Sequence, residues 1–509
     1  MDVFTTRAGR VRGRRSERDP GIVTVRGLPY AAPPFGADRF REPRPAQPWG
    51  GVRECTAYGP VAPQSAELPG SPAWSPEDED ILTLNIWAPA DGLPVLVWIH
   101  GGAYVFGSSA QPDFDGTALA ARGLVVVTLN HRLGFEGFGH VPADGEGPAC
   151  PDNRGLLDQI AALEWVRDTI AAFGGSPGRV TLAGQSSGAT SVACLMAADR
   201  ARGLFHRAIL HSAVNACATV GQAARTTAEV AAAAGVPATR AGLLAASPQT
   251  LVSASDRVVE RYRQDPGSGQ RHYDPAIYGP VADGDLLPCD PLEAWAAGAG
   301  AGADVELLVC HTTEEYWLLD AVGSSAKVTT EQQLHTFAAD FGLPPQLVDA
   351  YRDRLPDAAP VLDVYLALYG DLLFAEYSSR LAEAHARAGG RTYLSRFDRR
   401  SGGDAGDGGG GRVRAWHCAD IPFAFGNLHE ESLHFLMGGP PGPADHELAH
   451  RMTGAWAAFA AHGDPGWAPL DGGGEGSAVR VWRTAGEEAR ETDAFRDLWA
   501  AAGLPLLAP

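Results

Sequence analysis

The chain has 509 residues, 45% of them hydrophobic and 20% charged, and its formal net charge at pH 7 is -20. This composition is ordinary for a globular protein with a large core and argues against disorder. The negative charge repels polyanions, so nucleic acids and anionic membrane surfaces are poor candidates as partners.

The N-terminal region, residues 1–90, contains short apolar segments separated by prolines. Residues 21–25 and 82–87 predict antiparallel strands at the edge of a sheet, joined by long surface loops. Residues 1–7 include no apolar stretch of the kind that a secretory signal contains, which favours the cytoplasm.

From residue 93 onward, apolar and β-branched runs alternate with helical stretches. Helix 153–173 is predicted from apolar residues spaced three to four apart, and it ends in two glycines. The alternation predicts an α/β fold with a mostly parallel central sheet and helices on both faces. The predicted strands are 93–99, 124–129, 179–183, 208–211, 305–309 and 392–397.

The later part of the chain predicts a helical cap over about residues 320–390, because residues 330–387 are helical in pattern and contain no convincing strand. Two glycine-containing breaks, 264–270 and 401–411, are linkers or surface loops, and the second favours a surface loop. The uncharged run 208–224 is too short and too polar to span a membrane.

The most informative motif is Gly-Gln-Ser-Ser-Gly at positions 184–188, which follows predicted strand 179–183 and precedes helix-compatible residues 189–198. A strand, a sharp turn with a central serine and a helix form a nucleophile elbow. The glycines allow the strand and the helix to approach closely. Ser186 is therefore the candidate nucleophile.

A serine nucleophile needs a histidine base and an acid that orients and charges that histidine. Glu315 follows predicted strand 305–309 and His417 follows predicted strand 392–397, so both can reach the carboxyl edge of the sheet. The chain order Ser186, Glu315, His417 is the order found in α/β-hydrolases. Glu314 adjoins Glu315, and a surface role for either glutamate stays open.

Residues 100–104 form a small-residue loop after predicted strand 93–99. The backbone N–H groups of Gly102 and Ala103, with that of Ser187, predict an oxyanion hole. The seven cysteines are an odd, scattered set without C-x-x-C spacing, which predicts free thiols. Cys418 has no second ligand at a recognised spacing, so we expect no metal and no cofactor.

Together these motifs resemble the type B carboxylesterases, the cholinesterase-like branch of the α/β-hydrolases, including bacterial members. The resemblance covers about residues 8–485 and implies a single α/β-hydrolase catalytic unit over 1–509, with antiparallel N-terminal edge strands and the helical cap. It implies a serine ester hydrolase that acts on a small-molecule ester through an acyl-enzyme, without a cofactor. The matching blocks, in family order, are 27–31, 79–85, 100–104, 130–134, 153–159, 173–179, 184–188, 313–315 and 417–426.

Departures from the family pattern concern substrate preference. Gln185 stands where the family usually has glutamate, so we expect small uncharged esters as substrates. Ser212 matches a family serine close to the triad, and a buried structural hydroxyl is an equal alternative. Ile81 replaces a cysteine found in many members, which leaves Cys55 unpaired and agrees with a reducing compartment. The other departures are Ala103, Ser187 and Tyr316.

Two further interpretations remain. The same residues serve a carbamate or amide hydrolase, or a tailoring enzyme for one metabolite. A non-catalytic cholinesterase-like binding protein is a remote alternative, because such proteins typically lose the nucleophile. His131, His140 and His211 are predicted to be structural, and the oligomeric state is left undecided.

Overall fold

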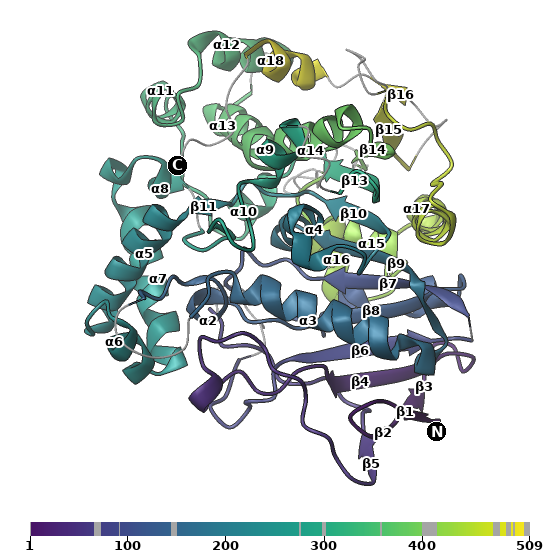
Figure 1. Ribbon diagram of the computed structural model, residues 1–509. Helices are drawn as coiled ribbons and strands as arrows, with labels where there is room; N and C mark the ends of the chain where they lie inside the picture. Colours follow the sequence, from purple (N-terminus) through teal and green to yellow (C-terminus); the bar gives the residue numbers. More distant parts are fainter. Residues whose placement is uncertain are drawn as a thin grey trace.

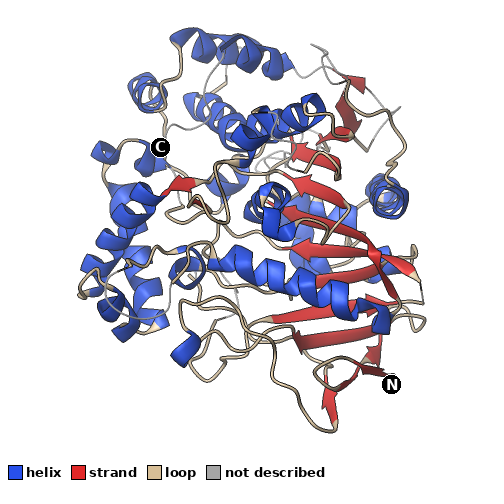
Figure 2. Cartoon of the chain, viewed as in Figure 1, coloured by secondary structure: helices blue, strands red, loops and turns tan. Residues whose placement is uncertain are grey.

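The structure, a computed structural model, describes most of the chain (Figure 1). Within the described residues, the central element is an 11-stranded sheet with helices packed on both sides (Figure 2). The ranges described are 2–65, 73–90, 92–143, 150–273, 276–297, 302–356, 359–399, 415–471, 479–484, 490–491 and 494–502.

The middle of the sheet is parallel and its two edges are antiparallel. The strands from β8 to β15 run parallel, whereas β6, β4 and β3 at one edge and β16 at the other are antiparallel. In spatial order the strands are β16 (Arg490–Glu491), β15 (Val479–Trp482), β14 (Thr392–Phe397), β13 (Glu306–Thr312), β10 (Arg207–His211), β9 (Gly175–Gln185), β7 (Leu93–Ile99), β8 (Val125–Leu129), β6 (Thr83–Ala88), β4 (Val23–Pro29) and β3 (Arg14–Arg15).

The predicted strands are all present, and the two predicted edge strands correspond to β4 and β6. Two small sheets were not predicted, because their strands have only two or three residues and carry little pattern. They consist of β1 (Val3–Thr5), β2 (Arg10–Arg12) and β5 (Val52–Glu54), and of β11 (Ala218–Thr219) and β12 (Val281–Ala282).

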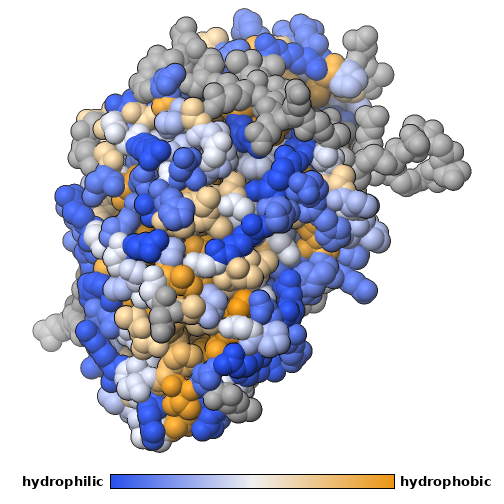
Figure 3. Space-filling view, turned by 90° about the vertical axis from the view of Figure 1, so that its right-hand side faces the viewer, coloured by the Kyte–Doolittle hydropathy of each residue, from blue (hydrophilic) through white to orange (hydrophobic). Residues whose placement is uncertain are grey.

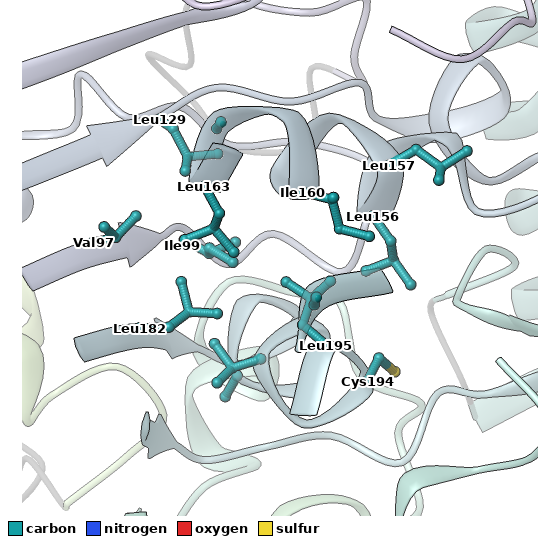
Figure 4. Close-up of a cluster of buried hydrophobic side chains, with 14 of the residues drawn as sticks. Val97, Ile99, Leu129, Leu156, Leu157, Ile160, Leu163, Leu182, Cys194 and Leu195 are labelled. Carbon is teal, nitrogen blue, oxygen red and sulfur yellow. The ribbon is translucent and has the colours of Figure 1, made fainter. Parts of the chain in front are cut away.

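Alternation along the strands divides the core between the two faces of the sheet. On β7, Val97 and Ile99 belong to one buried cluster and Trp98 to the other. The first cluster includes residues of α3 (Arg154–Thr169) and α4 (Ser187–Ala197), and Figure 4 shows Leu163 of α3 directed at Ile99 of β7. The second packs against α15 (Ile421–Phe425) and α17 (Pro443–His462).

The predicted helix 153–173 is α3 followed by a 3-10 turn, Ile170–Phe173. It ends where Gly174 adopts φ 81°, a left-handed conformation that glycine tolerates without strain. The shorter helices near the sheet are α1 (Thr117–Ala120), α2 (Gly134–Phe138), α9 (Pro291–Ala296), α10 (Trp317–Ala321) and α16 (His434–Met437).

The region expected to be a cap is helical. Its buried cluster includes Phe337, Tyr351 and Tyr365, and it is joined by Trp499 of the C-terminal helix α18 (Ala494–Ala502). Helix α14 (Glu376–Arg387), at the end of this region, packs on β13 and β14 of the central sheet. The segment consists of α11 (Glu331–Asp340), α12 (Pro345–Arg354), α13 (Val361–Gly370), a π-helix (Asp371–Ala375) and α14 (Glu376–Arg387).

A second helical group was not predicted from the sequence. Along the chain it comes after β10 and before β13. It consists of α5 (Val220–Ala234), α6 (Arg240–Ala245), α7 (Pro248–Gln264) and α8 (Gln270–Tyr273). The break at 264–270 is a 3-10 turn, Pro266–Ser268, between α7 and α8, so it is no linker. The break at 401–411 lies outside the described residues.

The surface has mixed polarity. On the face shown in Figure 3, hydrophobic residues form separate patches among hydrophilic ones, as is usual for a protein surface. None of the helices in the described ranges has the length and apolar character needed to cross a membrane.

Candidate active site

Ser186 occupies a strained turn between β9 and α4. Its φ of 57° and ψ of -126° are unusual for a residue other than glycine. A Cβ on Gly188 would lie 2.3 Å from the Ile99 carbonyl oxygen, so only glycine allows the helix to approach the neighbouring strand this closely. The Ser186 N–H donates to the His211 carbonyl at 2.8 Å, which holds the turn against β10. This geometry is that of a nucleophile elbow.

Glu315 and His417 form a buried hydrogen-bonded pair. His417 Nδ1 lies 2.6 Å from Glu315 Oε2, and the His417 N–H donates to the Glu315 carbonyl at 3.1 Å. The other carboxylate oxygen, Oε1, accepts from Ser212 Oγ at 2.6 Å and from Thr312 N–H at 2.7 Å. The structure therefore brings Ser212 into contact with the acid, and because its hydroxyl is also buried, both interpretations of this serine stay open.

The neighbouring Glu314 points elsewhere. Its Oε2 accepts from the Ala415 N–H at 3.1 Å, and its own N–H donates to the Ala415 carbonyl at 2.9 Å. Glu315, with its contact to His417, is the glutamate with the geometry of a triad acid.

His417 Nε2, the ring nitrogen that is not bonded to Glu315, faces Gln185. The two Nε2 atoms lie 2.9 Å apart, and the Gln185 amide also donates to Cys418 Sγ at 3.1 Å. Within the described ranges no hydrogen bond joins Ser186 Oγ to His417, whose two ring nitrogens contact Gln185 and Glu315. The Phe374 ring packs on the imidazole with ring centroids 4.3 Å apart.

The charge of His417 is controlled by its neighbours. Burial opposes the imidazolium, whereas a negatively charged Cys418 sulfur and the Glu315 carboxylate both favour it and raise the pKa of His417. Burial also raises the pKa of Cys418, so this thiol is neutral near pH 7. Glu315 is therefore the charge that stabilises a protonated His417.

The loop after β7 lies directly against the serine. A Cβ on Gly101 would be 3.1 Å from Ser186 Cβ. Gly102 and Ala103 have φ values of 123° and 50°, which turn the chain sharply here. In the described part of the chain, the N–H groups of Gly102, Ala103 and Ser187 meet no hydrogen-bond acceptor, so they are available to an oxyanion.

Behind the site, His211, Cys310 and Asp420 have ligand atoms within 4.8 Å of one another and are all buried. His211 Nδ1 lies 2.6 Å from Asp420 Oδ2, and His211 Nε2 accepts from Trp456 Nε1 at 2.7 Å. Because both ring nitrogens are engaged, we interpret the cluster as a hydrogen-bonded one and assign no metal to it. The residues come from three separate elements, so no sequence spacing could reveal it.

Other polar and aromatic residues near the site were also missed in the sequence. Asp113 is buried, and its burial raises its pKa to about 7; Cys418 lies close enough to interact with its charge. Phe374 lies in the π-helix, where nothing in the local sequence distinguishes a site residue from packing.

His100 and His131 stack in the core beside the loop, with ring centroids 4.8 Å apart. Burial lowers the pKa of His100 to about 3 and that of His131 to about 4. In an unfolded chain both residues titrate near pH 6.5. Their contribution to stability is thus complete above about pH 6.5 and is lost as the pH falls toward 4.

We therefore expect His131→Phe, which keeps a ring but cannot be protonated, to flatten the acid side of the stability profile. Between pH 6.5 and 4.5, the wild type should lose about 2 kcal/mol more unfolding free energy than the variant. Urea unfolding at both pH values measures this, with the exposed His335→Gln as control. Parallel losses in the wild type and in His131→Phe would contradict a buried neutral His131.

The comparisons with known proteins agree with this geometry. Residues 1–492 match the model of the carboxylesterase family. The chain is 34% identical over 497 residues to the para-nitrobenzyl esterase of Bacillus subtilis (strain 168), covering 96% of this chain and 94% of that protein. It is 35% identical over 468 residues to the phenmedipham hydrolase of Pseudarthrobacter oxydans, covering 88% of each.

A solved structure agrees with the family match. The crystal structure of a Geobacillus stearothermophilus carboxylesterase matches with a TM-score of 0.83 and 35% identity, covering 99% of this chain and 100% of that one.

Proposed function

The chain belongs to the carboxylesterase family, with an α/β-hydrolase fold, and is an ester hydrolase; we propose that it cleaves small uncharged esters through an acyl-enzyme on Ser186. The observation that carries the assignment of residues is the 2.6 Å contact between His417 and Glu315 beside the nucleophile turn. The resemblance inferred from the motifs is confirmed by the family match.

In the proposed reaction, Ser186 Oγ attacks the ester carbonyl while His417 Nε2 takes its proton. The oxyanion receives hydrogen bonds from the N–H groups of Gly102, Ala103 and Ser187. His417 then protonates the leaving alcohol, and water releases the acid by the same steps. Glu315 orients His417 and stabilises its charge, and Ser212 holds Glu315 through the 2.6 Å bond. No cofactor is needed.

The test of this function is a substrate panel. We expect p-nitrophenyl esters of short acids to be hydrolysed with higher kcat/KM than matched aryl carbamates and anilides, with a burst of nitrophenol from acylation. Faster turnover of carbamates or anilides would favour the alternative hydrolase. Absence of turnover of every ester would favour a binding protein.

We further propose that Gln185 sets the preference for uncharged substrates. Its amide contacts His417 Nε2 at 2.9 Å, so a carboxylate in its place would lie against the imidazole. Such a charge stabilises the protonated histidine, which cannot act as a base, and it attracts cationic alcohols.

Gln185→Glu should consequently move the acidic limb of the kcat/KM profile upward by about one pH unit. It should also improve choline-type esters relative to neutral esters of the same shape. The exposed Gln332→Glu, which adds the same charge on α11, serves as control. An unmoved limb and an unchanged substrate ratio in folded Gln185→Glu would contradict this role.

We propose that residues 1–509 act as one catalytic unit, with a helical cap at about 320–390. The buried cluster shared by Phe337, Tyr365 and Trp499 supports a packed cap. We also propose a cytoplasmic location, supported by the seven cysteines, which are all free; the sulfurs of Cys194 and Cys217 lie 4.0 Å apart without a bond. Nucleic acids and membranes are not expected partners of this acidic chain.

A further inference from the structure

We propose that the buried His211–Asp420 pair is a positioning pair, which fixes the segment carrying His417 relative to Ser186. This inference rests on the proposed function, because it assigns a purpose to groups that touch neither substrate nor the reacting atoms. Both side chains are fully buried, and the Nδ1 to Oδ2 distance is 2.6 Å.

The pair joins the two segments whose separation matters most to the reaction. His211 is the last residue of β10, and its carbonyl accepts the N–H of Ser186 at 2.8 Å. Asp420 lies three residues after His417, directly before α15. A bond between the two side chains therefore ties the nucleophile turn to the segment that carries the base.

This contact is the second histidine–carboxylate pair formed by the segment 417–420, which is joined by His417 to Glu315 after β13 and by Asp420 to His211 at the end of β10. In the first, the segment supplies the histidine, His417, to Glu315; in the second it supplies the carboxylate, Asp420, to His211. The backbone and side-chain hydrogen bonds at residues 415–418 hold the start of the segment, and the Asp420 bond adds a second attachment point three residues after His417. We infer that this second attachment limits movement of His417 relative to the turn that carries Ser186.

The orientation of His211 is itself fixed. Trp456 of α17 donates its indole N–H to His211 Nε2 at 2.7 Å, so a neutral ring must carry its proton on Nδ1 and donate it to Asp420. The rings of Trp98 and Trp456 pack on the imidazole, with centroid distances of 5.7 Å and 5.4 Å.

Burying this pair is unfavourable for the stability of the fold. Asp420 is buried, and its Oδ1 has the weakly donating Cys310 thiol as a neighbour instead of a strong donor, so the carboxylate is poorly compensated for its burial. Groups that break the packing rules in this way concentrate at functional sites. This unfavourable burial indicates that the pair serves to fix the position of the His417 segment at the active site.

The test compares His211→Leu with His211→Gln. Glutamine can donate to Asp420 and accept from Trp456, whereas leucine has similar bulk and can do neither. We expect His211→Leu to lower kcat on a p-nitrophenyl ester by about 10- to 100-fold with KM changed less than twofold, because a misplacement near 1 Å costs about that much. His211→Gln should restore kcat to within about threefold of wild type.

A spectroscopic signature separates positioning from general destabilisation. In a folded His211→Leu variant, the downfield proton resonance of the His417–Glu315 hydrogen bond should shift or broaden, and in His211→Gln it should be as in the wild type. Equal kcat in the leucine, glutamine and wild-type proteins, or an unchanged resonance in the leucine variant, would overturn the proposal.

Two further variants, Asp420→Ser and Ser186→Ala, allow the test to be interpreted whether or not His211→Leu folds. If His211→Leu does not fold, Asp420→Ser, whose short hydroxyl cannot reach His211, carries the same expectation. If neither accumulates as folded protein, the pair is a folding determinant and the proposal is overturned. Ser186→Ala is measured alongside: an active Ser186→Ala protein would mean that the proposed function has failed, whereas an inactive one with a fully active His211→Leu would mean that only the positioning role has failed.

Discussion

Ser186→Ala should lower kcat on p-nitrophenyl acetate by about 10³-fold or more while leaving the fold intact. The serine sits in the turn between β9 and α4 with φ 57°, and its hydroxyl is the group that would form the acyl-enzyme. Alanine retains the backbone and loses only that hydroxyl. The nucleophile and its base act as a unit, so His417→Ala should fall equally far.

Steady-state rates, with thermal melting as the check on folding, test this expectation. Ser191→Ala is the matched control, because Ser191 is also buried on α4 and its hydroxyl accepts a long 3.4 Å bond from Gln159. Its kcat should stay within about threefold of wild type. A folded Ser186→Ala protein that keeps more than a tenth of the rate would rule out Ser186 as nucleophile.

The parallel part of the fold could be predicted from sequence because its strands are buried on both faces. The run that became β7 is apolar throughout, and in the run that became β14 Thr392 to Leu394 and Phe397 flank Ser395 and Arg396; the predicted bounds of both agree with the observed ones. β13 was predicted to end at residue 309, but it continues to Thr312. The extension includes His311 and Thr312, which are buried polar residues that a hydrophobic pattern does not count as strand.

Helices that pack on other helices were less visible in the sequence. The group α5 to α8 follows β10 and the short β11, and the uncharged run 208–224 covers the whole change from strand to helix, so its composition does not show where α5 begins. β15 and β16 were missed because they are short and lie among residues rich in glycine.

The candidate site could be predicted to the extent that its chemistry depends on local motifs. Ser186 and the loop at Gly102 each follow a strand, so their place at the sheet edge follows from the topology. Phe374, Asp113 and the pair of His211 with Asp420 meet only after helices from distant parts of the chain have packed. Their local sequences contain no signal for that contact.

Glu315→Gln should also inactivate the enzyme, by about 10³-fold or more in kcat, whereas Glu314→Gln should cost less than about tenfold. The hydrogen bonds around Glu315 explain the size of the effect. Ser212 Oγ and Thr312 N–H both donate to Oε1, so in the variant they would hold the glutamine oxygen at that position. The glutamine NH₂ group would then face His417 Nδ1, where the carboxylate oxygen Oε2 now accepts.

Two donors cannot pair, so His417 would have to move its proton to Nε2 and could no longer accept the proton of Ser186. The loss should therefore appear in kcat and kcat/KM equally, with KM nearly unchanged. Glu314 bonds to Ala415 and not to the imidazole, so Glu314→Gln leaves the tautomer of His417 as it is. If Glu314→Gln were instead the inactive variant and Glu315→Gln remained active, the acid would be Glu314 and the contact with His417 would have no catalytic part.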